Sequence, residues 1–138
     1  TARRLLAHHL ARRPKANPIA VYAESFAGHA AALADRPPEY FHIYAFNTLR
    51  QVGANFEMLA SHIDWLGAHG LRGVERAAEA AGKISEGAKT MQFKLARAMA
   101  RKRFDGLAEM LAPMVEAYGV TMDVLDAKIT AEPSYRAA

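Results

Sequence analysis

The chain has 138 residues, enough for one domain with a single hydrophobic core. It contains no cysteine, which excludes disulfides, thiolate metal sites and a cysteine nucleophile. Its 18 Lys and Arg residues against 14 Asp and Glu give a formal net charge of +4, so nucleic acid, an anionic membrane surface and an acidic protein are the partner classes to consider.

No apolar run approaches the roughly 20 residues of a membrane span, and the Arg-rich start lacks the apolar centre of a secretory signal. We therefore expect a bacterial-type cytoplasmic protein that does not bind membranes. Because the first residue is Thr1 rather than Met, we also expect the chain to be a fragment of a longer protein.

Residues 1–16 are predicted to form a basic amphipathic N-terminal helix. Leu5, Leu6 and Leu10 recur at helical spacing between arginines. Pro14 then stops the helix, because proline cannot continue the backbone hydrogen bonding.

Asn17 followed by Pro18 predicts the start of a second helix, as an N-cap with proline at the first helical position. Apolar residues then recur at spacings of three and four. They are Ile19, Tyr22, Phe26, Ala30 and Leu33. The Asp-Arg-Pro-Pro run at 35–38 predicts the end of this helix.

A long helix is predicted from Pro38 and Glu39 to Leu66, since a negative side chain favours the positive end of a helix. One apolar stripe runs along its whole length. The stripe consists of Phe41, Ala45, Leu49, Val52, Phe56, Leu59, Ile63 and Leu66.

The opposite side of that helix differs from an ordinary exposed surface. Arg50, Glu57 and Asp64 are interleaved there with Phe46 and Gly53. We expect a second, polar packing surface and hence a helix at the centre of the molecule. Whether these charges serve a function or only pair structurally with neighbouring helices stays open.

A glycine-punctuated turn over 67–73 precedes a helix predicted from Val74 to Lys102, which should return antiparallel. Its stripe alternates steps of three and four, the pattern of packing against a neighbour at a shallow angle. The stripe consists of Val74, Ala77, Ala81, Ile84, Ala88, Met91, Leu95 and Ala98. Glu79 and Lys83 are spaced as an ion pair on the outer side.

The last part of the chain is predicted to hold two helices. The stripe that begins at Phe104 meets Pro113, which should kink or split the helix. Gly119 is predicted to end it and Thr121 to cap the final helix, and residues 133–138 should be a frayed tail. With no strand-like alternation and no internal repeat, we predict an all-α single domain over 1–138, an antiparallel bundle of four to five main helices.

Patterns for catalysis or metal binding are incomplete. Glu39 and His42 have the E-x-x-H spacing of di-iron bundles, but such sites need a second motif and two more carboxylates, so we expect no metal site. No serine lies in a nucleophile elbow, and no glycine-rich loop follows a strand. Acid or base chemistry by Glu57 stays open. We recognise no catalytic site, and leave open whether the parent protein is an enzyme.

A cluster of cations surrounds the end of the helix predicted over 74–102. The cluster consists of Lys94, Arg97, Arg101, Lys102 and Arg103. Favourable charge near a helix C-terminus explains it without any partner. Nucleic-acid binding would need aromatic side chains presented among the cations, and Phe93 and Phe104 fit packing better.

Four segments carry a resemblance to a known family. They are Asn17-Pro18-Ile19, the run FHIYAFNTLRQVGA at 41–54, Trp65-Leu66 and the run AKTMQFKLAR at 88–97. They resemble the C-terminal helical half of an uncharacterised bacterial family encoded beside amino acid:[carrier protein] ligases. Those ligases resemble seryl-tRNA synthetases and load an amino acid onto a phosphopantetheine carrier. The N-terminal half of the family resembles papain-like cysteine acyltransferases, and this chain contains neither that half nor a cysteine.

The resemblance implies a role for polar residues along two adjacent helices. They are His42, Tyr44, Arg50, Gln51, Glu57, Lys89, Gln92 and Arg97. They would form an interior network that positions a loop of the missing N-terminal half, or line a slot for an aminoacyl arm carried on phosphopantetheine. A purely structural network is the alternative.

Carrier proteins are typically acidic, so the resemblance makes Arg97, Arg101, Lys102 and Arg103 a candidate docking site. We therefore expect a helical companion domain of a carrier-protein-associated protein. It would assist transfer of a carrier-bound amino acid with no catalysis or cofactor of its own. Two alternatives stay open: a basic nucleic-acid-binding or regulatory module, and a dimerisation bundle in which helix 74–102 pairs with its own copy.

Overall fold

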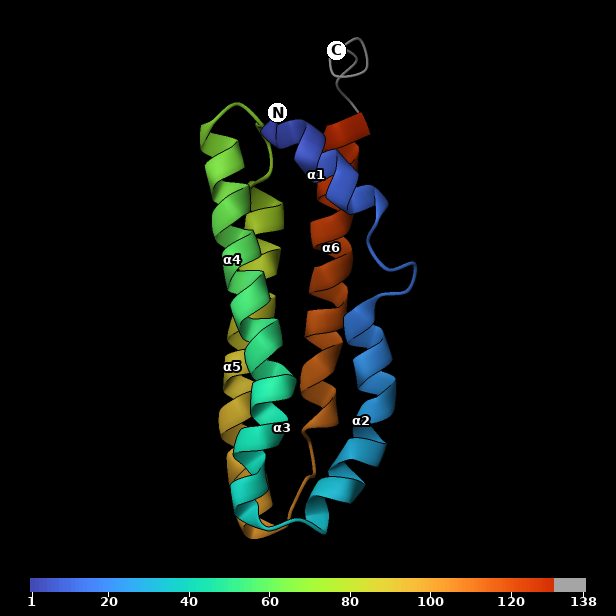
Figure 1. Cartoon of the computed structure of the whole chain (residues 1–138), viewed down its shortest axis with the longest axis vertical. Helices are drawn as coiled ribbons and strands as arrows, with labels where there is room; N and C mark the ends of the chain where they lie inside the picture. The colour runs from blue at the N-terminus through green and yellow to red at the C-terminus, as the bar shows by residue number, and fades with distance from the viewer. Residues whose placement is uncertain (131–138) are drawn as a thin grey trace.

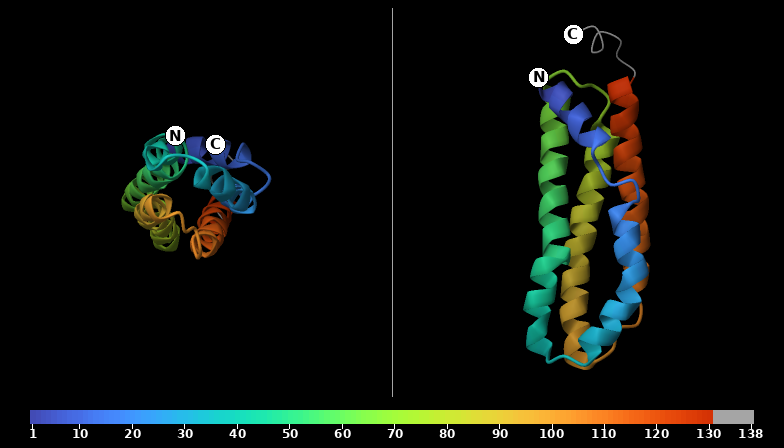
Figure 2. Two further views of the ribbon diagram at one scale, coloured as in Figure 1. Left: turned by 90° about the horizontal axis from the view of Figure 1, so that it is seen from below. Right: turned by 45° about the vertical axis from the view of Figure 1, so that its right-hand side comes forward.

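Four helical rods stand side by side in the computed structural model, which describes residues 1–130 (Figure 1). They are α2 (Pro18–Ala34), α3 (Phe41–Asn47) continued by α4 (Leu49–Ala68), α5 (Glu75–Arg101) and α6 (Leu111–Thr130). Two 3-10 turns, η1 (Pro38–Tyr40) and η2 (Ala108–Met110), precede α3 and α6. Figure 2 shows the rods around a common centre, each antiparallel to the next. The predicted all-α antiparallel bundle is confirmed, and the described residues include no strand.

The remaining helix, α1 (Ala2–Ala11), lies across the end of the bundle where α4 ends and α5 begins (Figure 1). Its Leu6 and Leu10 are buried in the apolar cluster of that end, which also contains Ile63 and Leu125. A second cluster fills the rest of the bundle and includes Phe26 of α2. One wall of the bundle is therefore built from two short helices, α1 and α2, each covering part of the core.

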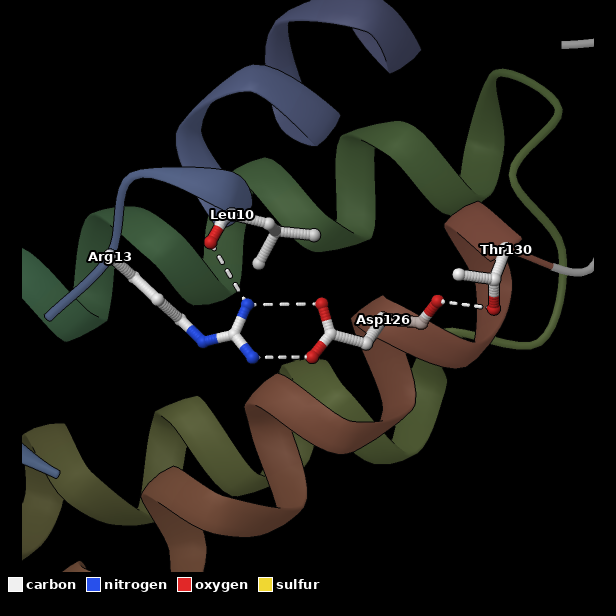
Figure 3. Close-up of polar contacts among 4 residues, drawn as sticks. All are labelled: Leu10, Arg13, Asp126 and Thr130. Atoms are coloured by element: carbon white, nitrogen blue, oxygen red, sulfur yellow. Dashed lines mark hydrogen bonds and ion pairs between the residues drawn. The ribbon is translucent and has the colours of Figure 1, made fainter. Parts of the chain in front are cut away.

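Arg13, just after α1, connects this corner to α6 (Figure 3). Its Nη1 and Nη2 donate to the two carboxylate oxygens of Asp126 at 3.0 and 2.5 Å. Nη1 also donates to the Leu10 carbonyl at 2.9 Å, where α1 ends. The helix predicted over 1–16 is therefore shorter than expected, and the residues after it turn back to reach α6.

The helix starts and turns read from the sequence agree with the structure at several points. Asn17 Oδ1 accepts hydrogen bonds from the Ile19 and Ala20 amides at 3.0 and 3.2 Å, so the predicted cap is confirmed. Gly70 and Gly73 have positive φ angles in the turn before α5, a conformation that favours glycine. The helix predicted from Val74 to Lys102 corresponds to α5, with the predicted apolar stripe buried.

The long helix predicted from Pro38 to Leu66 is divided at Thr48, whose backbone angles are φ −128° and ψ −91°. The Thr48 hydroxyl donates to the Tyr44 carbonyl at 2.7 Å. A threonine that bonds back onto the preceding turn in this way competes with the helical ladder and bends a helix. The apolar stripe still faces the core, since Ala45, Leu49 and Ile63 are fully or nearly fully buried.

We predicted a second, polar packing surface on this helix, and the prediction is wrong for the charged residues. Arg50, Glu57 and Asp64 are all exposed. Gly53 is buried instead, its carbonyl accepts a hydrogen bond from Ser85 Oγ at 2.9 Å, and α4 packs more extensively on α5 than on any other element. The reason is steric: small residues let two backbones approach closely, which leaves the longer charged side chains at the edges of the contact.

The predicted division of the last helices is also wrong, because α6 runs from Leu111 to Thr130 without a break. Pro113 lies in its first turn, where a missing amide hydrogen costs no helical hydrogen bond. Gly119 lies mid-helix without positive φ. Thr121 is buried and its hydroxyl donates to the Ala117 carbonyl at 2.8 Å, so it caps nothing. The predicted tail at 133–138 lies outside the described residues.

Candidate functional site

The cations at the end of α5 surround one hollow of about 410 Å³. Arg97, Arg101 and Arg103 line it together with Lys94, and Asp105 lies on its wall. All five side chains are exposed. Three of the four residues predicted for partner docking therefore converge on one surface.

Lys102, the fourth predicted docking residue, faces another element. Its backbone is left-handed, with φ 55°, where α5 ends and the chain reverses. Its Nζ donates to the Arg36 carbonyl just after α2. Lys102 thus holds the ends of α5 and α2 together and does not line the hollow.

A second groove, of about 440 Å³, lies between α5 and the start of the α3–α4 rod. It is lined by Phe41, Arg50, Lys89, Gln92, Phe93 and Ala96. Phe93 is 76% exposed. Because Phe93 and Arg97 are one turn apart on α5, this aromatic ring stands between the groove and the basic hollow.

An exposed aromatic side chain flanked by arginines is the composition of protein interface hot spots. We name this surface, made by Arg50, Lys89, Phe93, Lys94, Arg97, Arg101 and Arg103, the α5 docking surface. The expectation that Phe93 serves packing is wrong, whereas Phe104 packs against the core as expected. The sequence did carry a signal, because Phe93 is about 160–200° from Met91 and Leu95 of the buried stripe.

Glu57 and Lys89 pair across the α4–α5 contact, with Lys89 Nζ donating to Glu57 Oε2 at 3.0 Å. Both side chains are exposed. Exposed pairs of this kind contribute about 0–1 kcal/mol, so the pair is a minor element of stability. The Glu57 carboxylate therefore partly compensates the positive charge of Lys89 on the α5 docking surface.

Tyr44 belongs to a different cluster, between α2 and α3. Its hydroxyl shares a hydrogen bond with the Tyr22 hydroxyl at 2.6 Å and another with His29 Nδ1 at 2.9 Å. Burial raises the pKa of both tyrosines above the ordinary value for a phenol. Beside this cluster, the Arg36 guanidinium lies 4.7 Å from the centre of the Tyr40 ring.

The eight polar residues predicted as one interior network therefore do not form one. Arg50, Lys89, Gln92 and Arg97 line the α5 docking surface or its groove. Tyr44 is in the tyrosine cluster, and Gln51 lines a cleft between α2 and α4. His42 is exposed with its ring against Phe41, and Glu57 is exposed beside Lys89. The helix predicted to hold most of them has one side in solvent, which is where its long polar side chains lie.

Glu39 and His42 do not gather further ligands, and residues 1–130 contain no group of three or more side chains placed to hold a metal ion. Within the same residues, no helix combines the length and apolar character that crossing a membrane requires. The α5 docking surface offers positive charge and the exposed ring of Phe93.

The family model of the DUF1839 C-terminal domain matches residues 1–127. The chain belongs to the DUF1839 C-terminal domain family. This is a family of domains of unknown function, in agreement with the resemblance read from the sequence, while the gene neighbourhood and the N-terminal half stay predictions. Searches of the curated proteins and of the solved structures gave no significant match to this DUF1839 C-terminal domain.

Proposed function

We propose that this domain docks an acidic protein, of the carrier-protein class, on the α5 docking surface. In this proposal it is the helical companion domain of a bacterial, cytoplasmic carrier-protein-associated protein and assists transfer of a carrier-bound amino acid. The phosphopantetheine arm and the transferred amino acid would come with the partner. The observation that carries the proposal is the exposed Phe93 ring in the groove, one helical turn from Arg97 of the basic hollow.

Charge and exposure together support a protein partner. The cations would steer an acidic protein toward the surface and raise the association rate. Phe93 would then supply apolar contact area at the centre of the interface, where buried residues contribute most to the binding free energy. A phenylalanine that is 76% exposed gains little for the isolated domain, since most of its ring stays in water in the fold.

Carboxylates on the same surface favour a protein over nucleic acid. Asp105 lines the basic hollow, and Glu57 pairs with Lys89 at the edge of the groove. Both would repel a phosphate backbone, whereas an acidic protein can place its carboxylates selectively between them. Burial of the alanine stripe of α5 against the other helices supports docking over the dimerisation alternative, in which that stripe would pair with its own copy.

The experiment compares charge reversals at two places on the protein. Arg101→Glu with Arg103→Glu is expected to weaken binding to a small acidic carrier protein by about tenfold or more. The matched control is Lys15→Glu with Arg72→Glu, which changes the net charge equally at exposed positions outside the docking surface. Calorimetric titration at low and high ionic strength gives both affinity and salt dependence.

A third variant, Phe93→Ala, separates apolar from electrostatic binding. It should weaken binding by a similar factor at both ionic strengths, because ring burial is not screened by salt. The proposal fails if the docking reversal is no worse than its control. If the domain instead binds any DNA duplex, with log affinity falling linearly with log salt, the nucleic-acid alternative replaces it.

A further inference from the structure

One side of the bundle, the seam between α2 and α4, contains a cleft of about 380 Å³ that shares no lining residue with the α5 docking surface. This is the more loosely packed side, because α2 packs mainly on α6 while α4 packs mainly on α5. Ile19, Leu49 and Met114 form part of its lining and all three are buried. The volume lies within the range of about 300–1,000 Å³ typical of small-molecule sites.

The rim of this cleft is polar but carries no charge. Asn47, Gln51 and Asn55 line it at intervals of four residues, so their carboxamides follow one edge. None of its lining residues is charged, although 23% of the residues in the chain are Asp, Glu, Lys or Arg. An ionic ligand group would find no counter-charge there, which makes its desolvation unfavourable.

The carboxamides at this rim are available to a ligand. Gln51 and Asn55 are exposed, and neither makes a side-chain hydrogen bond to any other residue in the range 1–130. The Asn47 Nδ2 donates to the Ile43 carbonyl at 3.0 Å, which leaves its Oδ1 free to accept. A carboxamide both donates and accepts, so it is complementary to another amide.

The tyrosine cluster fixes one wall of the cleft. The Tyr22 side chain lines it, and the Tyr22 hydroxyl is hydrogen-bonded to Tyr44, which in turn is bonded to His29. The Tyr22 ring is held at its far end by the bond to Tyr44, and Tyr44 is itself fixed by His29, so the ring keeps its position before any ligand arrives. Preorganisation of this kind reduces the entropy lost on binding.

We propose that this cleft binds a neutral, elongated ligand consisting of an aliphatic chain that carries an amide group. The aliphatic part lies on the apolar floor formed by Ile19, Leu49 and Met114. The amide group exchanges hydrogen bonds with Gln51 and Asn55 at the rim. The site is independent of protein docking on α5, since the two surfaces share no residue.

The test uses N-hexylacetamide as the probe, with hexylammonium and hexanoate as charged analogues of the same chain length. Titration is followed through the side-chain amide signals of Gln51 and Asn55 in two-dimensional NMR. Saturable shifts at these signals are expected with N-hexylacetamide, and affinity for either charged analogue should be lower by about tenfold or more.

Substitution then assigns the hydrogen bonds. Gln51→Ala with Asn55→Ala should weaken N-hexylacetamide binding by about tenfold, while Gln92→Ala, in the groove of the α5 docking surface, should leave it unchanged. Gln51 and Asn55 are exposed, so the double variant is expected to fold. The comparison of the three probes on the unaltered protein tests the proposal independently of this variant. Absence of saturation, equal binding of the charged analogues, or unchanged binding by the double variant would each overturn the proposal.

Discussion

Gly53 of α4 is buried against α5, and substituting it with larger residues should separate the effect of helix propensity on stability from the effect of packing. A Cβ atom added at this position would be 3.7 Å from Ala88 Cβ and 3.8 Å from both Lys89 Cγ and the Ser85 carbonyl oxygen. These are ordinary van der Waals distances. A methyl group therefore fits, whereas further carbon atoms meet the facing helix.

The magnitudes follow from that geometry. Gly53→Ala should stabilise the domain by about 1 kcal/mol, since alanine is the better helix former and nothing has to move. Gly53→Leu gains a similar propensity term but overpacks the contact, which costs about 1–3 kcal/mol. Gly82 on α5 provides the control, because a Cβ atom there would meet nothing within 4 Å.

The assay is thermal and urea unfolding of the four variants Gly53→Ala, Gly53→Leu, Gly82→Ala and Gly82→Leu. For 138 residues, 1 kcal/mol corresponds to a change in Tm of about 3–4 °C. Both alanine variants should melt above the parent, and Gly53→Leu should melt several degrees below Gly82→Leu. Equal stability of the two leucine variants would refute a close α4–α5 contact at Gly53.

Two further predictions concern Arg13 and the partly buried Tyr22 and Tyr44. A double-mutant cycle with Arg13→Gln and Asp126→Asn should give a coupling free energy of about 0.5–1 kcal/mol. This coupling should decrease with added salt, because the two side chains are 34% and 40% exposed. A coupling that does not change with salt would contradict the prediction. Burial raises the pKa of Tyr22 and Tyr44 in the folded state, so the unfolded chain releases these phenolic protons first. The stability is thus fully present below about pH 10 and decreases as pH rises further. Urea unfolding across this range should show the decrease, and Tyr22→Phe with Tyr44→Phe should reduce its slope; a slope unchanged by that substitution would assign it to other groups.

The candidate site was only partly accessible from the sequence. The cationic composition of the α5 end could be read directly, but Lys102 could not be separated from Arg101 and Arg103 without knowing that the chain reverses there. The cleft between α2 and α4 brings Tyr22 beside Gln51 and Asn55, and no spacing in the chain indicates that proximity.

The sequence by itself determined that the chain is helical and which stripe along it is apolar, because a residue's place around a helix follows from its number alone. Asn17 and Pro18 likewise predict a helix start, because the Asn17 side chain accepts a hydrogen bond from an amide only two residues away. Only the tertiary structure decided that Gly119 leaves α6 unbroken and that Arg50 and Glu57 face water. The physical reason is that these outcomes depend on neighbouring helices. The packing energy of a surrounding core can override a local conformational preference of about 1 kcal/mol. The periodicity of one helix does not indicate which helix packs against it.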